Sequence, residues 1–191
     1  MKMFKRLAAV LLAGAMVLAM LTACGGPKTD EQKAEDAYMA ALNGLFNAEW
    51  SNNAEIKAAA KKLVSENVTD EGEFTENGFM SVDTDRGLIL MILPDGNKPA
   101  ALTSEDIASL NEESINAMIP DMQAQLKAMM KDQNGNSVSD EQFAASLAGL
   151  KEAVIAAGVG VVKKADGKYY AAMGVQLPMS SSGDSTQKSG Q

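Results

Sequence analysis

Apolar residues return at helical spacing in four stretches of the chain, and each stretch begins behind a typical helix-capping residue. The first follows the capping-box sequence of residues 29–32 and extends to Phe46. The second begins after Asn53 and carries an apolar stripe through Val64, so these two stretches predict consecutive amphipathic helices. Three lysines of the second helix are expected on its solvent side: Lys57, Lys61 and Lys62.

The third stretch contains a proline. It starts at the capping-box sequence of residues 103–106 and keeps its helical period to Met130, with methionines that we expect to pack in the core. Because proline lacks an amide hydrogen and clashes with the preceding turn, Pro120 predicts two shorter helices that meet at Ile119. The fourth stretch begins at the cap Ser139 and runs to Gly158, a glycine suited to ending a helix.

Two further segments have the patterns of strands. Residues 88–93 are apolar without interruption and stop at a Pro-Asp-Gly turn, which predicts a central strand covered on both faces. Residues 159–164 and 168–176 have period two around an Asp-Gly pair, which predicts a β-hairpin. A short strand is also expected around Phe74.

These elements predict an α/β (α+β) fold, a three-layer α/β/α sandwich with four to five helices around a small sheet and a C-terminal β-hairpin. A single globular domain is expected over residues 30–178. Residues 179–191 are rich in serine and glycine and contain too few apolar residues to fold, so we expect a disordered tail.

The N-terminus has the organisation of a secretory signal peptide. Lys2, Lys5 and Arg6 precede an uncharged apolar run over residues 7–21, which is too short for a comfortable membrane span. The run ends in Leu-Thr-Ala-Cys at residues 21–24, and this ending resembles the lipobox of bacterial lipoproteins.

That resemblance implies cleavage between Ala23 and Cys24 and a thioether-linked diacylglycerol on the Cys24 sulfur. Two acyl chains are enough to anchor a protein stably in a bilayer. Residues 24–29 then form a short tether that holds the domain close to the membrane. The alternatives are an ordinary secretory signal with a chance cysteine, or an uncleaved anchor helix.

Composition excludes several classes of function. Residues 1–23 hold three of the 17 basic residues and none of the 25 acidic ones, so the mature chain of 191 − 23 = 168 residues has a charge of 14 − 25 = −11. Such an acidic chain argues against nucleic-acid partners and favours cationic ones. Cys24 is the only cysteine and there is no histidine, which removes disulfides and the commonest general base and transition-metal ligand.

Three local motifs suggest chemistry but lack the context that it needs. Asp132, Asn134 and Asn136 match the first ligands of an EF-hand-like calcium loop, yet Ser137 replaces the turn glycine and Phe143 replaces the bidentate acid. The glycines at 158 and 160 precede a predicted strand rather than open a helix, unlike a dinucleotide fingerprint. A serine-lysine spacing at 185–188 lies in the expected tail. We therefore expect no metal and no cofactor besides the lipid.

The mature chain also resembles bacterial CAP (SCP-like) extracellular domains, on residues of its first helices, a central turn and its closing hairpin. The resemblance implies the same three-layer sandwich, but the family's cavity histidines and Gly-Glu-Asn segment are absent, and Phe46 stands where an arginine is usual. It thus implies a kept fold without the metal-binding cavity. The matching residues are Ala41-Leu42-Asn43, Trp50, Ile56, Ala59-Ala60, Pro94-Asp95-Gly96 and the segment from Gly158 to Tyr170.

The sequence favours a membrane-anchored lipoprotein that faces the extracellular side or the periplasm and is a non-enzymatic binding or interaction module. The membrane is its partner through the lipid, and a protein or a small molecule is its expected ligand. Two alternatives are a carboxylate-dependent envelope hydrolase and a ligand-capturing lipoprotein that serves a transporter. A hydrolase would need paired carboxylates in an apolar cleft.

Overall fold

The computed structural model describes residues 27–76, 78–130 and 135–178, which form a mixed α+β fold with five helices packed on an antiparallel sheet. The helices are α2 (Asp30–Phe46), α3 (Ala54–Asn67), α4 (Ser104–Ser109), α5 (Glu112–Met129) and α6 (Asp140–Ala153). The strands are β1 (Met80–Asp83), β2 (Leu88–Ile92), β3 (Pro94–Asp95), β4 (Lys98–Pro99), β5 (Ala101–Leu102), β6 (Ala156–Lys163) and β7 (Tyr169–Gln176).

The C-terminal hairpin is the centre of the sheet. β7 pairs with β6 along its whole length on one side, and on the other side it pairs with β2 and, further along, with β5. β1 pairs with β2, so the sheet runs β1, β2, β7, β6 and all of its pairs are antiparallel. The predicted hairpin is confirmed, and Gly167 supplies the left-handed backbone of its turn with a φ of 82°.

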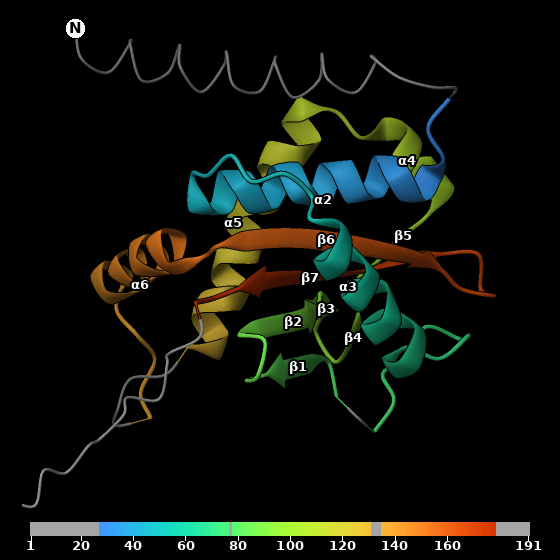
Figure 1. Ribbon diagram of the computed structural model, residues 1–191. Helices are drawn as coiled ribbons and strands as arrows, with labels where there is room; N and C mark the ends of the chain where they lie inside the picture. The colour runs from blue at the N-terminus through green and yellow to red at the C-terminus, as the bar shows by residue number, and fades with distance from the viewer. Residues whose placement is uncertain (1–26, 77, 131–134, 179–191) are drawn as a thin grey trace, which may run out of the picture.

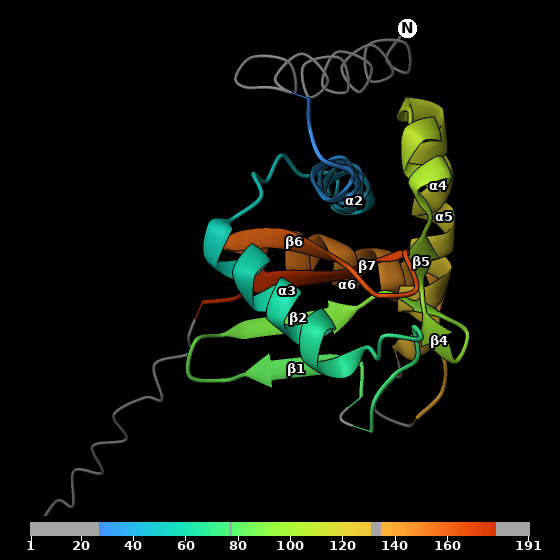
Figure 2. The same cartoon turned by 90° about the vertical axis from the view of Figure 1, so that its right-hand side faces the viewer.

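Three helices surround this hairpin (Figures 1 and 2). α3 covers one face of β6, β7 and β2, and α5 crosses the opposite face, while α2 lies along the outer side of β6. α3 can approach closely because glycines lie beneath it: a Cβ on Gly160 would lie 2.6 Å from the carbonyl oxygen of Lys57, and one on Gly158 would lie 2.9 Å from the Cβ of Ile56. These glycines therefore serve helix packing.

The predicted N-terminal caps are confirmed, but Gly158 does not end the fourth helix, because α6 stops at Ala153 and Gly158 lies in β6. Thr29 and Ser139 accept the amide hydrogens of Gln32 and Gln142, whose side chains accept the cap amides in return. Asn53 caps α3 through two amides of its first turn. Each cap satisfies donors that the first helical turn leaves unpaired, which explains why these positions could be predicted from spacing.

The predicted break at Pro120 is wrong. The chain leaves the helical conformation at Leu110 and Asn111, and α5 then continues through Pro120 to Met129. Asn111 starts the new helix because its side chain accepts the amide hydrogen of Ser114 and its own amide binds the Ser114 hydroxyl. The Asn-Ser capping box thus determines the boundary, and the exposed proline is accommodated inside the helix.

β2 is not covered on both faces as predicted. Leu88, Leu90 and Ile92 are buried under α3, whereas Ile89 and Met91 on the other face are only partly buried. The strands that are buried on both faces are β6 and β7. β1 was not predicted, and the strand expected around Phe74 is a single bridge between Phe74 and Val68.

Candidate functional site

The sequence-predicted anchor residues Ala23 and Cys24 lie outside the described residues, as do Asp132 and Asn134 of the calcium-like loop. Within the described ranges, no group of three histidine, cysteine or acidic side chains is placed to hold a metal. None of the described helices is long and apolar enough to cross a bilayer. The two outer strands of the sheet, β6 and β1, differ in what covers their edges.

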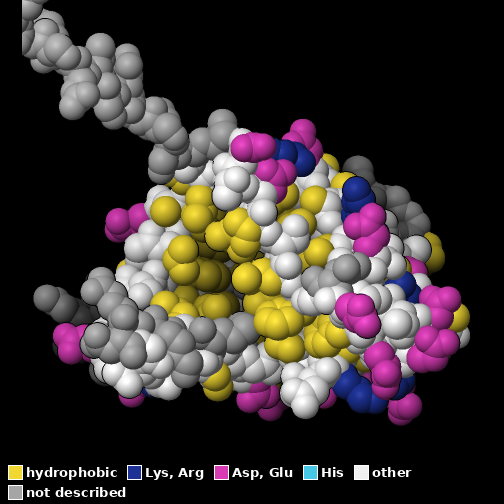
Figure 3. Space-filling view, turned by 90° about the horizontal axis from the view of Figure 1, so that it is seen from below, with side chains coloured by type: hydrophobic (Ala, Val, Ile, Leu, Met, Phe, Trp, Pro, Cys, Tyr) yellow, Lys and Arg dark blue, Asp and Glu magenta, His cyan; other side chains and the backbone are white. Residues whose placement is uncertain are grey.

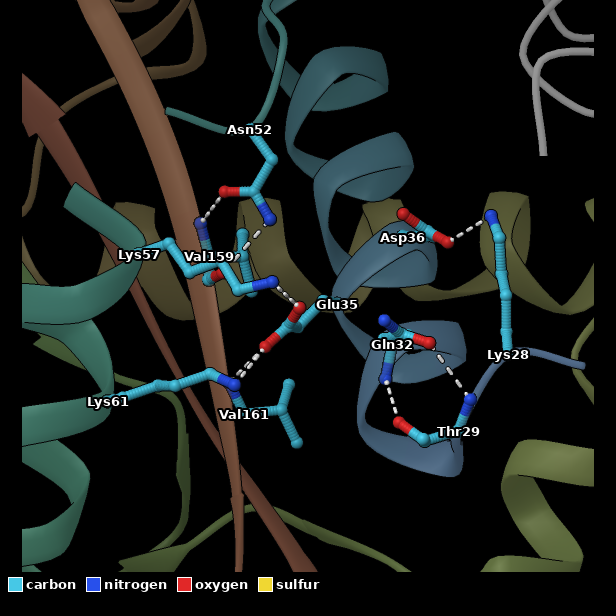
Figure 4. Close-up of polar contacts among 10 residues, drawn as sticks. All are labelled: Lys28, Thr29, Gln32, Glu35, Asp36, Asn52, Lys57, Lys61, Val159 and Val161. Atoms are coloured by element: carbon cyan, nitrogen blue, oxygen red, sulfur yellow. Dashed lines mark hydrogen bonds and ion pairs between the residues drawn. The ribbon is translucent and has the colours of Figure 1, made fainter. Parts of the chain in front are cut away.

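The edge of β6 is closed by side chains (Figure 4). The Asn52 side chain donates to the carbonyl of Val159 over 3.0 Å and accepts its amide hydrogen over 2.9 Å, in the manner of a neighbouring strand. One step before this, the amide of Asn53 donates to the carbonyl of Ala157. The loop between α2 and α3 thus occupies the hydrogen-bonding groups at the start of the strand.

Glu35 continues this closure. Its side chain projects from α2 and is 3% exposed, and Oε1 accepts the amide hydrogen of Val161 over 3.5 Å. The same carboxylate pairs with the ammonium groups of Lys57 and Lys61 on α3, the second at 2.8 Å. A buried carboxylate needs such partners because desolvation disfavours its charged form. Glu35 therefore joins α2, α3 and β6.

Two of the three lysines expected on the solvent side of α3 thus have another role. Lys57 and Lys61 are 33% and 38% exposed and point across β6 to Glu35, whereas Lys62 is 73% exposed, as expected. Sequence reasoning missed Glu35 because the chain around it, Glu31 to Asp36, is rich in charged residues. The available signal was its place one residue after Ala34 and three before Tyr38, on the apolar stripe.

An open recess of about 470 Å³ lies beside this ion-pair cluster. The first turn of α2, the two lysines of α3 and the last residues of β6 line it, among them Glu31 and Lys163. Lys163 lies 5.1 Å from the centre of the Tyr169 ring, and the other two lysines pair with Glu35. The cations around this recess are thus engaged within the protein.

The tip of the hairpin has its own polar contact. The Tyr170 hydroxyl donates to Asp166, and burial together with this carboxylate raises the pKa of Tyr170 above its ordinary value. Burial alone would raise the pKa of Asp166, but the hydrogen bonds from Tyr170 and the Lys168 amide and the charge of Lys168 outweigh it, so the pKa is lowered. Asp166 is therefore a carboxylate at neutral pH.

The other outer strand, β1, lies beside an apolar face that the helices leave partly open. Cross-strand pairing aligns two rows of side chains on this face, from β1 through β2 and β7 to β6. In the first row the exposed fraction is 0% at Val159, 9% at Met173 and 55% at Met80, with Met91 partly buried between the last two. The second row runs through Ala157, Val175, Ile89 and Val82, and Val82 is 54% exposed.

The apolar face therefore continues past its helical cover to the edge of the sheet. Figure 3, a view from the β1 side of the molecule, shows hydrophobic side chains gathered around a hollow. Half-buried side chains of α5 pack against the same core, among them Met118, Met122 and Leu126. Met118 and Met122 do contact the core, as predicted, but none of the α5 side chains that the structure describes is fully buried.

The backbone of β1 is open as well. The amide of Ile92 donates to the carbonyl of Phe79, so the antiparallel ladder directs the polar groups of residues 79, 81 and 83 toward β2. The N–H and C=O groups of Met80 and Val82 consequently point away from the sheet. Within the described ranges these backbone groups have no hydrogen-bond partner, and the two apolar side chains are exposed on the adjoining face.

Comparisons with protein-family models, with curated proteins and with solved structures find no match to this chain.

Proposed function

We propose that the protein is a lipid-anchored envelope protein whose globular part is a non-enzymatic binding module, with its binding surface at β1 and the open apolar face. The observation that carries this proposal is the rise in exposure along each cross-strand row, which ends in Met80 and Val82 at more than half exposed. A run of exposed apolar side chains that continues a core is typical of an interaction surface. We call this surface, made by Met80, Val82, Ile89, Met91 and Val175, the open face.

The polar cluster on the opposite edge supports the non-enzymatic part of the proposal. A carboxylate-dependent hydrolase requires an acid that can exchange a proton with a substrate. Glu35, the buried acid of the described chain, has both oxygens engaged, by Lys57, Lys61 and the Val161 amide. Its contacts join three elements of the fold, so the alternative of an envelope hydrolase has less support.

The position of the tether supports the membrane-bound part. The described chain begins at Pro27 and enters α2, which lies along β6, whereas β1 is at the opposite side of the sheet (Figure 1). A lipid on Cys24, separated from Pro27 by two residues, would hold the β6 side near the bilayer. The open face would then point away from the membrane, toward partners in the envelope. The CAP-like kinship stays a prediction.

Two experiments test the proposal. In cells fed an alkynyl fatty acid, the wild-type chain should become labelled and the Cys24→Ala variant should not. The variant should also be lost from the membrane fraction. Unchanged labelling in the variant would refute the anchor.

The binding surface is tested with a photo-crosslinking amino acid introduced into the full chain in cells, at Val82 or, as a control, at the exposed Ala58 of α3. We expect discrete adducts from position 82 and none from position 58. Equal adducts at both positions, or none at either, would refute a partner at the open face.

A further inference from the structure

We propose that β1 binds an extended peptide segment with alternating apolar and basic residues, which adds to the sheet as an antiparallel strand. This inference rests on the proposed function and names the class of partner that the open face takes. Three features of the molecule carry it: the free backbone of the edge, the side chains on its two faces, and the charge around it.

The free backbone groups favour an extended ligand. Met80 and Val82 direct their N–H and C=O groups outward, and these groups match the spacing of an added strand. The opposite edge of the same sheet is blocked, because Asn52 occupies the amide and the carbonyl of Val159 and Glu35 occupies the amide of Val161. β1 is therefore the edge available for strand addition.

The side chains of β1 favour an alternating ligand. Met80 and Val82 lie on the open face, while Ser81 and Asp83 lie on the other face of the strand. In an antiparallel pair, residues that lie opposite one another point to the same face. A partner strand should thus place apolar side chains beside Met80 and Val82 and polar, cationic ones beside Asp83.

The surrounding charge favours a cationic partner over a second copy of the chain. Residues 76–86, which contain β1 and its turn, have three acidic residues, Glu76, Asp83 and Asp85, and one basic residue, Arg86. Arg86 pairs with Glu55, and among the described residues Glu76 and Asp85 take part in none of the ion pairs. Two mature chains of charge −11 would repel each other at this edge, whereas a basic segment is attracted to it.

The test uses the full lipidated chain in a mild detergent and a synthetic probe, an acetylated and amidated Lys-Val-Lys-Val-Lys-Val-Lys peptide. In the proposed register the valine amides point to β1 and the lysine amides point to solvent. N-methylation of the valine nitrogens should abolish binding, whereas N-methylation of the lysine nitrogens should leave it within about threefold, because only the former removes inward donors. A peptide with glutamate in place of lysine should not bind.

Variants of the chain sharpen the test. Val82→Pro removes an outward donor without touching the ladder to β2 and should weaken binding of the probe about tenfold. Asp83→Asn should reduce the dependence of binding on salt. Circular dichroism checks the fold of each variant, and the N-methylated probes need no variant at all.

Equal binding of both N-methylated probes, absence of binding, or a dimer of the chain through β1 in sedimentation would overturn the inference. The proposed function fails separately. A discrete partner crosslinked at position 82, together with indifference to N-methylation, would keep the binding module and refute strand addition.

Discussion

The two outer strands of the sheet differ in their outward backbone groups, which are bonded to side chains in β6 and open in β1. β6 is eight residues long, and a loop, an asparagine and a buried carboxylate cover its edge. β1 is four residues long and its edge has exposed side chains. A long apolar edge strand is an aggregation hazard, so its closure by Asn52 and Glu35 protects the chain, whereas a short edge can stay open for a partner.

Substitutions in and around β6 should lower the free energy of unfolding more than substitutions in β1. The largest loss is expected at Gly160 of β6. A Cβ there would lie 2.6 Å from the Lys57 carbonyl and 2.7 Å from the Lys61 amide, so Gly160→Ala should push α3 from the sheet. We expect a loss of about 3 kcal/mol in the free energy of unfolding, measured with urea. The control Gly149→Ala, at an exposed helical site with no atom near its Cβ, should instead gain about 0.5–1 kcal/mol. Equal effects would refute the close packing.

Glu35→Gln should have the next largest effect. The substitution keeps the shape but leaves Lys57 and Lys61 without their counter-charge, although both can turn partly toward solvent. We expect a loss of about 2 kcal/mol. Asp36→Asn is the matched control on the same helix, because its pair with Lys28 is about one third exposed and should contribute less than about 1 kcal/mol. A control as costly as Glu35→Gln would contradict the role of Glu35 at the edge.

Asn52→Ala removes a donor and an acceptor from Val159 without changing charge. Water can reach this half-buried position, so we expect a loss of about 1.5 kcal/mol in thermal or urea unfolding. Val82 is the comparison site on β1, where the outward backbone groups need no side-chain partner. Val82→Thr should therefore change the free energy of unfolding by no more than about 0.5 kcal/mol. A reversed order of these two effects would break the contrast between the edges.

The smallest effect is expected at the hairpin tip. Because the pKa of Asp166 is lowered in the folded chain, its contribution is present above the unfolded pKa of about 3.9 and is lost as the pH falls through the lower folded value. Asp166→Asn should therefore cost less than about 0.5 kcal/mol at neutral pH, since the group is largely solvated, and this cost should shrink as the pH falls through the folded pKa. A difference that does not change with pH would contradict the ionised Asp166–Tyr170 contact.

The parts of the fold that depend on neighbours in the chain could be predicted from the sequence. Capping boxes place side chain and backbone partner three residues apart, which is why the starts of α2, α4 and α6 were correct. The Asp-Gly turn likewise predicted the hairpin. The break predicted at Pro120 is wrong because the capping box at Asn111 sets the start of α5, and the helix continues through the proline.

The candidate site could not be predicted, because its parts meet only in the fold. Glu35 reaches a strand 126 residues away, and Asn52 reaches one 107 residues away. Only two residues of β1, Met80 and Val82, are apolar, which is too short a pattern to distinguish from a loop. Whether residues 88–93 are covered on one face or on two depends on how far the helices extend over the sheet. An uninterrupted apolar run does not distinguish the two cases.

Amide hydrogen exchange of the full chain tests most directly the claim that one edge of the sheet is closed and the other is open. The Val159 amide, bonded to Asn52, should exchange about a hundredfold or more slowly than the amides of Met80 and Val82. Ser81, whose amide points toward β2, is the control for the integrity of β1 and should be protected relative to both neighbours. Protection of Met80 and Val82 equal to that of Val159 would contradict the open edge.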